Sequence, residues 1–147
     1  MRERLRGYAH RIDIAAGVNA VWQALTDEAS LARWCSPNAQ IRPKAGGLFR
    51  ASVDRVTELD AHIDVFDPGR RLRLIYLPSS ALPPGEATLV DDFILEPAGS
   101  GTILRVLGSG FPDHPQWDAQ YRRLRTGWER AIARLKVFVE KLQKEAS

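Results

Sequence analysis

The spacing of apolar residues changes along the chain and divides it into three parts. Residues 8–14 alternate loosely between apolar and polar side chains, which predicts a first strand. Apolar residues then recur at helical spacing and predict two short helices, one capped by Asn19 and one over residues 27–34 that Pro37 ends. From residue 40 to residue 109 the period falls to two, so we expect strands there.

Short turn sequences separate these alternating segments. Gly46-Gly47 and Pro68-Gly69 are two of them, and residues 98–101 link residues 89–96 to residues 102–109 as a hairpin. Consecutive strands joined by short turns predict an antiparallel meander of about six or seven strands with one buried face.

The last segment has the clearest period. Its apolar residues are spaced alternately by four and three, at Trp117, Tyr121, Leu124, Trp128, Ala131, Leu135, Phe138 and Leu142. This spacing predicts one amphipathic helix about 40 Å long. A coiled coil has the same heptad, but aromatic side chains are too bulky for a narrow two-stranded seam. We therefore expect an α+β fold in which this helix covers the apolar face of the sheet.

Composition limits the class of protein. The chain has 147 residues, of which 44% are hydrophobic and 27% charged, and this predicts one soluble domain over residues 1–147. Its apolar runs are far shorter than the ~20 residues of a membrane-spanning helix. No apolar targeting segment follows the first residues, so we expect neither a membrane span nor export. The single cysteine, Cys35, fits a reducing compartment, and the expected location is the cytoplasm.

The charge balance is mildly basic. The formal net charge is +3 and the sequence pI is near 9.3. The excess is small, and opposite charges interleave four residues apart on the predicted final helix. This pattern favours a solvated surface of mixed charge over a nucleic-acid footprint, so we expect no nucleic-acid partner.

Short motifs in a fixed order cover nearly the whole chain. They are Val21-Trp22-Gln23-Ala24-Leu25-Thr26-Asp27, Leu31-Ala32-Arg33-Trp34 with Pro37, Gly46-Gly47-Leu48-Phe49-Arg50, Asp67-Pro68-Gly69-Arg70-Arg71-Leu72, Phe93-Ile94-Leu95-Glu96-Pro97 with Gly101-Thr102, Ser109-Gly110-Phe111 and Gly127-Trp128. In this order they resemble the START-like (SRPBCC) superfamily and, more narrowly, the family named for the activator of the heat-shock protein 90 ATPase.

The resemblance implies a helix-grip, or Bet v 1-like, fold. In that fold a curved antiparallel sheet of six or seven strands wraps around a long C-terminal helix and a cavity, and two short helices follow the first strand. The resemblance does not fix the function, because the superfamily contains lipid carriers, ligand sensors, polyketide cyclases and co-chaperones.

Three positions depart from the family pattern. Cys35 and Ser36 stand where a second aromatic residue and a glycine usually follow the tryptophan, which is expected to free volume at one end of the cavity. Residues 15–17 (Ala-Ala-Gly) lack the usual proline before the first helix. Asp91 occupies a strand position that is commonly valine.

Asp91 is unusual because aspartate is depleted in strands. The predicted hairpin register pairs it with Gly108 on the inward face, so its carboxylate is expected to enter the cavity beside open space and to have a raised pKa. Two alternatives are a bulge that turns Asp91 to solvent, and a buried arginine or water that satisfies it. Its neighbour Asp92 is expected to face outward and to pair with Arg105.

The expected pocket has aromatic walls, one carboxylate and one or two phenols, which suits a small apolar ligand. Its expected lining is Trp34, Cys35, Phe49, Leu74, Tyr76, Asp91, Phe93, Val106, Gly108, Trp117, Tyr121 and Leu124. Aromatic residues at helical spacing are more often core than ligand cage, and we expect Trp128 and Phe138 to be core. Gly127 is expected to allow a close approach of a neighbouring element.

Other chemistry has little support in the sequence. Cys35 is a reactive thiol only if Arg33 lowers its pKa, and a small packing residue is the favoured interpretation. The three histidines are scattered, and no metal-ligand spacing, nucleophile elbow or phosphate-binding loop occurs. We therefore expect no metal and no cofactor.

Three functions remain open. The leading hypothesis is non-enzymatic binding of a small hydrophobic or aromatic molecule in the cavity. The alternative is a polyketide cyclase/dehydratase-like enzyme with Asp91 as acid or base and Tyr121 or Tyr76 as oxyanion donor. The third is a co-chaperone-like interaction protein, as the family name implies, although the family's activator has a separate N-terminal chaperone-binding domain that we do not expect in this chain. A homodimer is compatible with the family.

Overall fold

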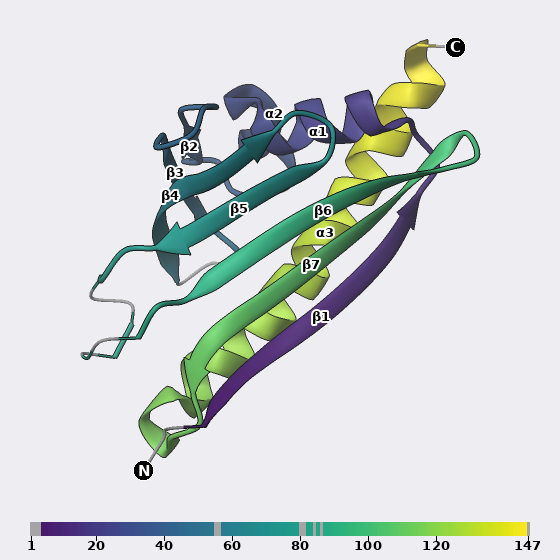
Figure 1. The fold of residues 1–147 in the computed structure, drawn as a ribbon. Coiled ribbons are helices and arrows are strands. Elements are labelled where there is room, and N and C mark those ends of the chain that lie inside the picture. Colours follow the sequence, from purple (N-terminus) through teal and green to yellow (C-terminus); the bar gives the residue numbers. More distant parts are fainter. Residues whose placement is uncertain (1–3, 55–56, 80–81, 84, 86, 147) are drawn as a thin grey trace.

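Seven antiparallel strands form one sheet in the computed structural model, which describes residues 4–54, 57–79, 82–83, 85 and 87–146. The strands are β1 (Leu5–Ile14), β2 (Gln40–Ile41), β3 (Leu48–Ser52), β4 (Glu58–Asp67), β5 (Arg71–Tyr76), β6 (Val90–Ala98) and β7 (Gly101–Pro112). Their order is β1-β7-β6-β5-β4-β3-β2. Strands β2 to β7 are thus the predicted meander, and the first strand pairs with the last (Figure 1).

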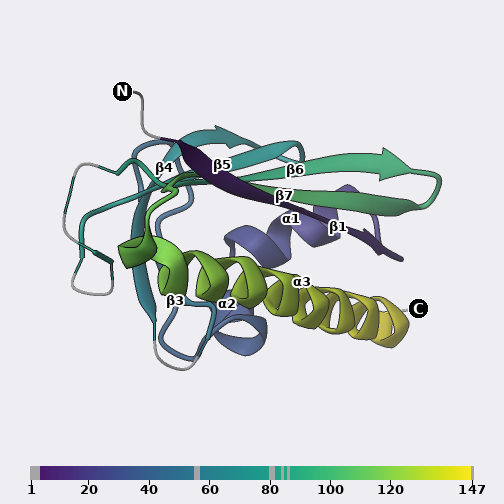
Figure 2. The same ribbon diagram turned by 90° about the horizontal axis from the view of Figure 1, so that it is seen from below.

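The helices of the described residues lie on one side of this sheet (Figure 2). They are α1 (Val18–Thr26), α2 (Glu28–Trp34) and α3 (Asp118–Ala146), and a 3-10 turn, η1 (Pro115–Trp117), leads into α3. The 29 residues of α3 span about 43 Å. Together these elements are the helix-grip fold, so the predicted architecture is confirmed.

The helix caps follow the local sequence with one difference. The Asp27 side chain accepts a hydrogen bond from Ser30 N at 3.0 Å and so caps α2, close to the predicted boundary. The prediction that Asn19 caps α1 is wrong. Gly17, in an extended conformation, is the N-cap, because the helix begins at Val18.

The core lies between the sheet and α3. Alternate residues of β5, Leu72, Leu74 and Tyr76, point inward and are buried. They face the buried stripe of α3, whose large aromatic member, Trp128, is 1% exposed. Each fully buried large apolar side chain contributes about 1.5–3 kcal/mol relative to an exposed one. The predicted packing of the helix on the sheet is therefore confirmed.

Gly127 allows α3 to approach the end of β3 closely, as predicted. A Cβ atom placed on Gly127 would lie 2.6 Å from Cγ2 of Val53. A side chain at this position would push the helix away from the sheet.

Several ion pairs lie on the outward face of the sheet. Asp92 faces outward as predicted, but the predicted partner is wrong. Both oxygens of Asp92 accept hydrogen bonds from Arg71 on β5, at 2.8 and 2.6 Å, while Arg105 donates to Glu96 at 3.0 Å.

Among the described residues, no helix combines the length and the hydropathy that crossing a bilayer requires.

Candidate functional site

Asp91, on the inward face of β6, is fully buried with both carboxylate oxygens engaged. Tyr8 Oη donates to Oδ1 and Tyr76 Oη donates to Oδ2, each at 2.5 Å. The tyrosines come from β1 and β5, on either side of the β6–β7 hairpin. Buried charged or polar groups require such partners, and here two phenols meet the requirement.

A glycine on β7 makes this arrangement fit. Gly108 pairs with Asp91 on one side and with Tyr8 on the other, so the three residues form a row across three strands. A Cβ atom on Gly108 would lie 2.2 Å from Cζ of Tyr8. The ring of Tyr8 therefore lies over Gly108 and reaches across β7 to Asp91.

The Asp91–Gly108 register was predicted correctly, but the expected open space beside Asp91 is not there, because the ring of Tyr8 occupies it. The alternatives of a bulge that turns Asp91 to solvent and of a buried arginine are also wrong, since Asp91 is 0% exposed and its hydrogen bonds come from tyrosines. The alternation of residues 8–14 places Tyr8 at the start of a strand but does not indicate its contact with Asp91.

Burial controls the protonation of this cluster. It raises the pKa of Asp91 from 3.8 to about 7, against the opposing effect of the hydrogen bonds from Tyr76 and Tyr8. Burial, reinforced by the nearby Asp91 charge, also raises the pKa of both tyrosines well above 10.0. The phenols therefore keep their protons and donate to the carboxylate. When Asp91 takes up a proton near neutral pH, one of its oxygens becomes a donor, and the phenol that it meets must then accept.

Trp128 of α3 closes the cluster from the helix side. Its ring packs edge-on against Phe93, with 5.0 Å between the ring centroids. Its buried indole N–H makes no hydrogen bond at standard geometry within the described part of the chain. It nevertheless lies close enough to lower the pKa of both Asp91 and Tyr76.

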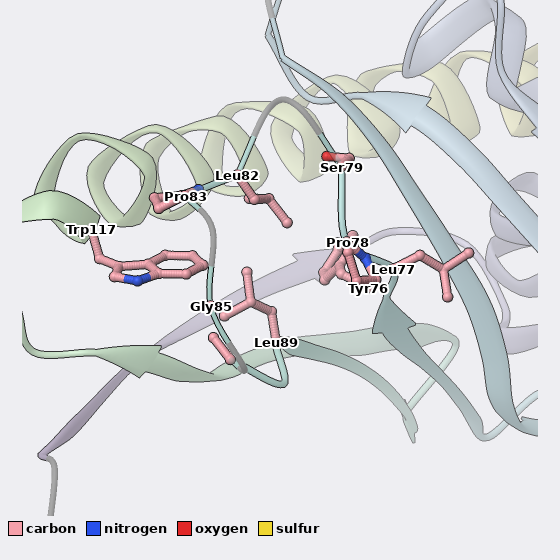
Figure 3. Close-up of a pocket in the computed structure, with 10 residues that line it drawn as sticks. Tyr76, Leu77, Pro78, Ser79, Leu82, Pro83, Gly85, Leu89 and Trp117 are labelled. Carbon is pink, nitrogen blue, oxygen red and sulfur yellow. The ribbon is translucent and has the colours of Figure 1, made fainter.

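Tyr76 also borders a pocket that opens at this end of the sheet. The pocket has a volume of about 80 Å³ and lies between the end of β5, the start of β6 and η1. Figure 3 shows the indole of Trp117 on one side and Tyr76 with Pro78 on the other, with Leu82 and Leu89 between them. The lining is Tyr76, Leu77, Pro78, Ser79, Leu82, Pro83, Gly85, Ala87, Leu89 and Trp117. Most of these side chains are apolar or aromatic.

The remaining residues of the expected lining fall into two groups. Six are buried in the core, namely Trp34, Phe49, Leu74, Phe93, Val106 and Leu124. Tyr121 is only partly buried, and its hydroxyl donates to Gly7 O at 2.7 Å. Its ring lies under the guanidinium groups of Arg6 and Arg125, at 4.7 and 5.3 Å from the centroid. Tyr8, rather than Tyr121, is thus the second phenol on Asp91.

Cys35 is a packing residue in this structure. Burial raises the pKa of its thiol to about 12, and the cation that opposes this effect is Arg134. Arg33 instead lies over the ring of Phe138, 5.1 Å from its centroid. The alternative of a thiol activated by Arg33 is therefore wrong. Cys35 and Ser36 line a surface depression of about 520 Å³.

No metal-binding group is evident in the ranges that the structure describes. Within them, no three histidine, cysteine, aspartate or glutamate side chains gather closely enough to hold a metal ion. The polar chemistry of the site is that of one carboxyl group, two phenols and an indole N–H.

The fold defines the class of protein. A seven-stranded antiparallel sheet gripping a long C-terminal helix, with two short helices after the first strand, is the architecture of START-like (SRPBCC) domains. A family model described as "Activator of Hsp90 ATPase homolog 1-like protein" matches residues 15–140. The chain belongs to this family. No curated protein matches it in sequence.

Several solved structures share the fold. Protein MLL2253 from Mesorhizobium loti is 24% identical, with a TM-score of 0.79 over 92% of this chain and 98% of that one. The Aha1 dimer from Colwellia psychrerythraea is 21% identical, with a TM-score of 0.78 over 92% and 96%. DynU16, a putative protein in the dynemicin biosynthetic locus, is 22% identical, with a TM-score of 0.70 over 91% and 47%. Identities this low establish a common fold and nothing more.

Proposed function

We propose that this protein binds a small apolar or aromatic molecule in the pocket between Tyr76, Leu89 and Trp117. The observation that carries the proposal is the lining of this pocket, where two aromatic side chains, the phenol of Tyr76 and the indole of Trp117, stand among several aliphatic side chains. Ligand sites in proteins are largely apolar concavities with a few placed polar groups. Family and fold fit ligand-binding domains of the START-like superfamily.

The size of the pocket narrows the ligand. A volume of about 80 Å³ is smaller than the roughly 150 Å³ of a cavity that takes up benzene. The part of the ligand that enters is thus smaller than a whole benzene ring, such as one edge of a ring or a short branched chain, and the rest lies at the open mouth. Tyr76 is held by Asp91, so its ring presents a fixed wall to the ligand.

Nuclear magnetic resonance with phenol and toluene as probes tests this function. Phenol and toluene are expected to shift the indole N–H signal of Trp117 in a saturable way. Ala87→Trp fills the pocket and is expected to abolish the response, whereas Val137→Trp adds the same bulk at a residue that is 67% exposed and is expected to preserve it. A response that is absent from the native protein, or that survives in Ala87→Trp, would refute the proposal. Native mass spectrometry of the purified protein would identify a ligand that copurifies.

A second candidate function, acid–base catalysis by Asp91, is favoured by the raised pKa of its carboxyl group, about 7. Asp91 is fully buried and both oxygens are occupied, so a substrate would have to displace a tyrosine. With a ligand in hand, an Asp91→Asn variant that binds it but no longer converts it would favour the enzyme. A ligand that native protein leaves unchanged would favour binding alone.

A further inference from the structure

A further depression lies along α3, next to the one that Cys35 and Ser36 line, with which it shares Val53, Asp54 and Arg134. It has a volume of about 540 Å³ and is lined by four arginines, Arg122, Arg123, Arg130 and Arg134, with Val53 and the backbone of Gly127 beneath them. The close packing of Gly127 on Val53 brings β3 against the helix at this point. The arginines therefore stand around a hollow and not on a flat surface.

The charge of this depression is not balanced by its neighbours. Its one lining carboxylate, Asp54, accepts hydrogen bonds from Thr57 at the backbone N and the side-chain Oγ1. Within the described part of the chain, Arg122, Arg123 and Arg130 form no ion pair or hydrogen bond. By contrast, four arginines of the sheet, Arg6, Arg50, Arg71 and Arg105, each have a carboxylate within 3.0 Å.

Three of the four acidic residues of α3 are engaged by β1 or by the residue that follows it. Asp118 pairs with Arg6 at 2.7 Å, and Glu129 lies 3.8 Å from His10. Glu140 accepts a hydrogen bond from Ala15 N at 2.8 Å. Three of the four acids of this helix thus face β1 or the residue that follows it, and the face toward Val53 is left cationic.

We propose that the arginine depression is a docking site for an acidic segment of a partner protein. Arg123 and Arg134 are 11 residues apart on α3, which places them about 16 Å apart along the helix axis. An extended peptide covers that distance with about five residues at roughly 3.3 Å each. Arginine pairs well with carboxylates because its planar guanidinium can donate two parallel hydrogen bonds.

Other anions fit the depression less well. A single phosphate engages one or two guanidinium groups and leaves the rest of the 16 Å row unpaired. Single-stranded nucleic acid requires aromatic platforms for its bases, and no aromatic side chain is among the described residues that line this depression. Arg134 is already fixed by its hydrogen bond to Trp34 O at 3.0 Å, so one end of the row is preordered.

Fluorescence anisotropy of a fluorescein-labelled hexaglutamate peptide tests the proposal. Binding is expected at about 10 mM salt, where the Debye length is about 30 Å, and is expected to weaken strongly at about 150 mM. Arg123→Glu/Arg130→Glu is expected to weaken binding by at least about tenfold. The control Arg11→Glu/Arg42→Glu makes the same change in net charge at exposed sites outside the depression and is expected to stay within about twofold of the native protein.

The control variants separate a docking site from a general charge effect. Equal loss in both double variants would overturn the proposal, as would the absence of binding to the native protein at low salt. Tighter binding of oligothymidylate than of the peptide would also overturn the proposal. So would displacement of the peptide by pyrophosphate at equal concentration, because another anion would then be the better ligand. Arg123→Ala/Arg130→Ala, checked by circular dichroism, provides the same comparison if charge reversal disturbs folding.

Discussion

Replacing Asp91 by asparagine removes a fully buried carboxyl group whose pKa lies near neutral pH. The pKa of Asp91 is about 7 in the folded chain, where the side chain is buried, and 3.8 in the unfolded chain, where it is not. Between these values the unfolded chain carries an ionised carboxylate while the folded chain keeps the proton. Folding therefore takes up a proton, and the free energy of unfolding falls as the pH rises. The loss is complete above the folded pKa and amounts to about 4 kcal/mol over the whole interval.

Urea unfolding of native protein and Asp91→Asn measures this loss. From about pH 5 to about pH 7 the free energy of unfolding of the native protein is expected to fall by about 2–3 kcal/mol relative to that of Asp91→Asn. Asp92→Asn removes the adjacent outward carboxylate, which is paired with Arg71, and is expected to keep the native pH dependence. A difference between native protein and Asp91→Asn that stays constant over this range would mean that Asp91 ionises at an ordinary pKa, and the argument from burial would be refuted.

Three further predictions concern the same cluster and the thiol. Tyr8→Phe removes a hydrogen bond to the carboxylate, so the pKa of Asp91 should rise further in a ¹³C carboxyl titration, and at alkaline pH the variant should lose about 1–3 kcal/mol of unfolding free energy. Gly108→Ala places Cβ against the Tyr8 ring and should lower the free energy of unfolding by about 1–3 kcal/mol. Adding Tyr8→Ala should restore part of this loss, and strictly additive losses in the double variant would contradict the contact. Cys35 should react with iodoacetamide only when the chain is unfolded in urea, because burial raises the pKa of its thiol to about 12; rapid alkylation of the folded protein, followed by mass spectrometry, would contradict this.

The sequence was sufficient to predict the elements and the hairpin register. The turn at residues 98–101 fixes how β6 and β7 pair, and this alone places Asp91 opposite Gly108. Period-two alternation then decides which of Asp91 and Asp92 faces inward. Both steps depend only on residues close together in the chain, where pattern and geometry are tightly linked.

The partners of these residues could not be predicted in the same way. Tyr8 reaches Asp91 because β1 pairs with β7, and the paired residues are 88 to 107 positions apart in the sequence. The alternation of apolar and polar residues within β1 does not indicate which strand lies beside it. Asp92 similarly has neighbours on two strands, and the hairpin reveals only one of them, whereas Arg71 lies on the other. One signal was present, since a glycine within a strand often marks close approach by another group. At Gly108 that group is the ring of Tyr8.

The pairing of β1 with β7 has a consequence for biosynthesis. Strand β1 leaves the ribosome well before β7, its partner in the described sheet, which is completed at Pro112 about a hundred residues later. At 5–20 residues per second this is a delay of roughly 5–20 s. Until β7 is made, β1 has no strand of the described sheet to pair with, so the contact of Tyr8 with Asp91 cannot form through this pairing. Strand β1 is therefore translated before the other strands of the described sheet but cannot pair until β7 is complete, and this pairing brings Tyr8 onto Asp91.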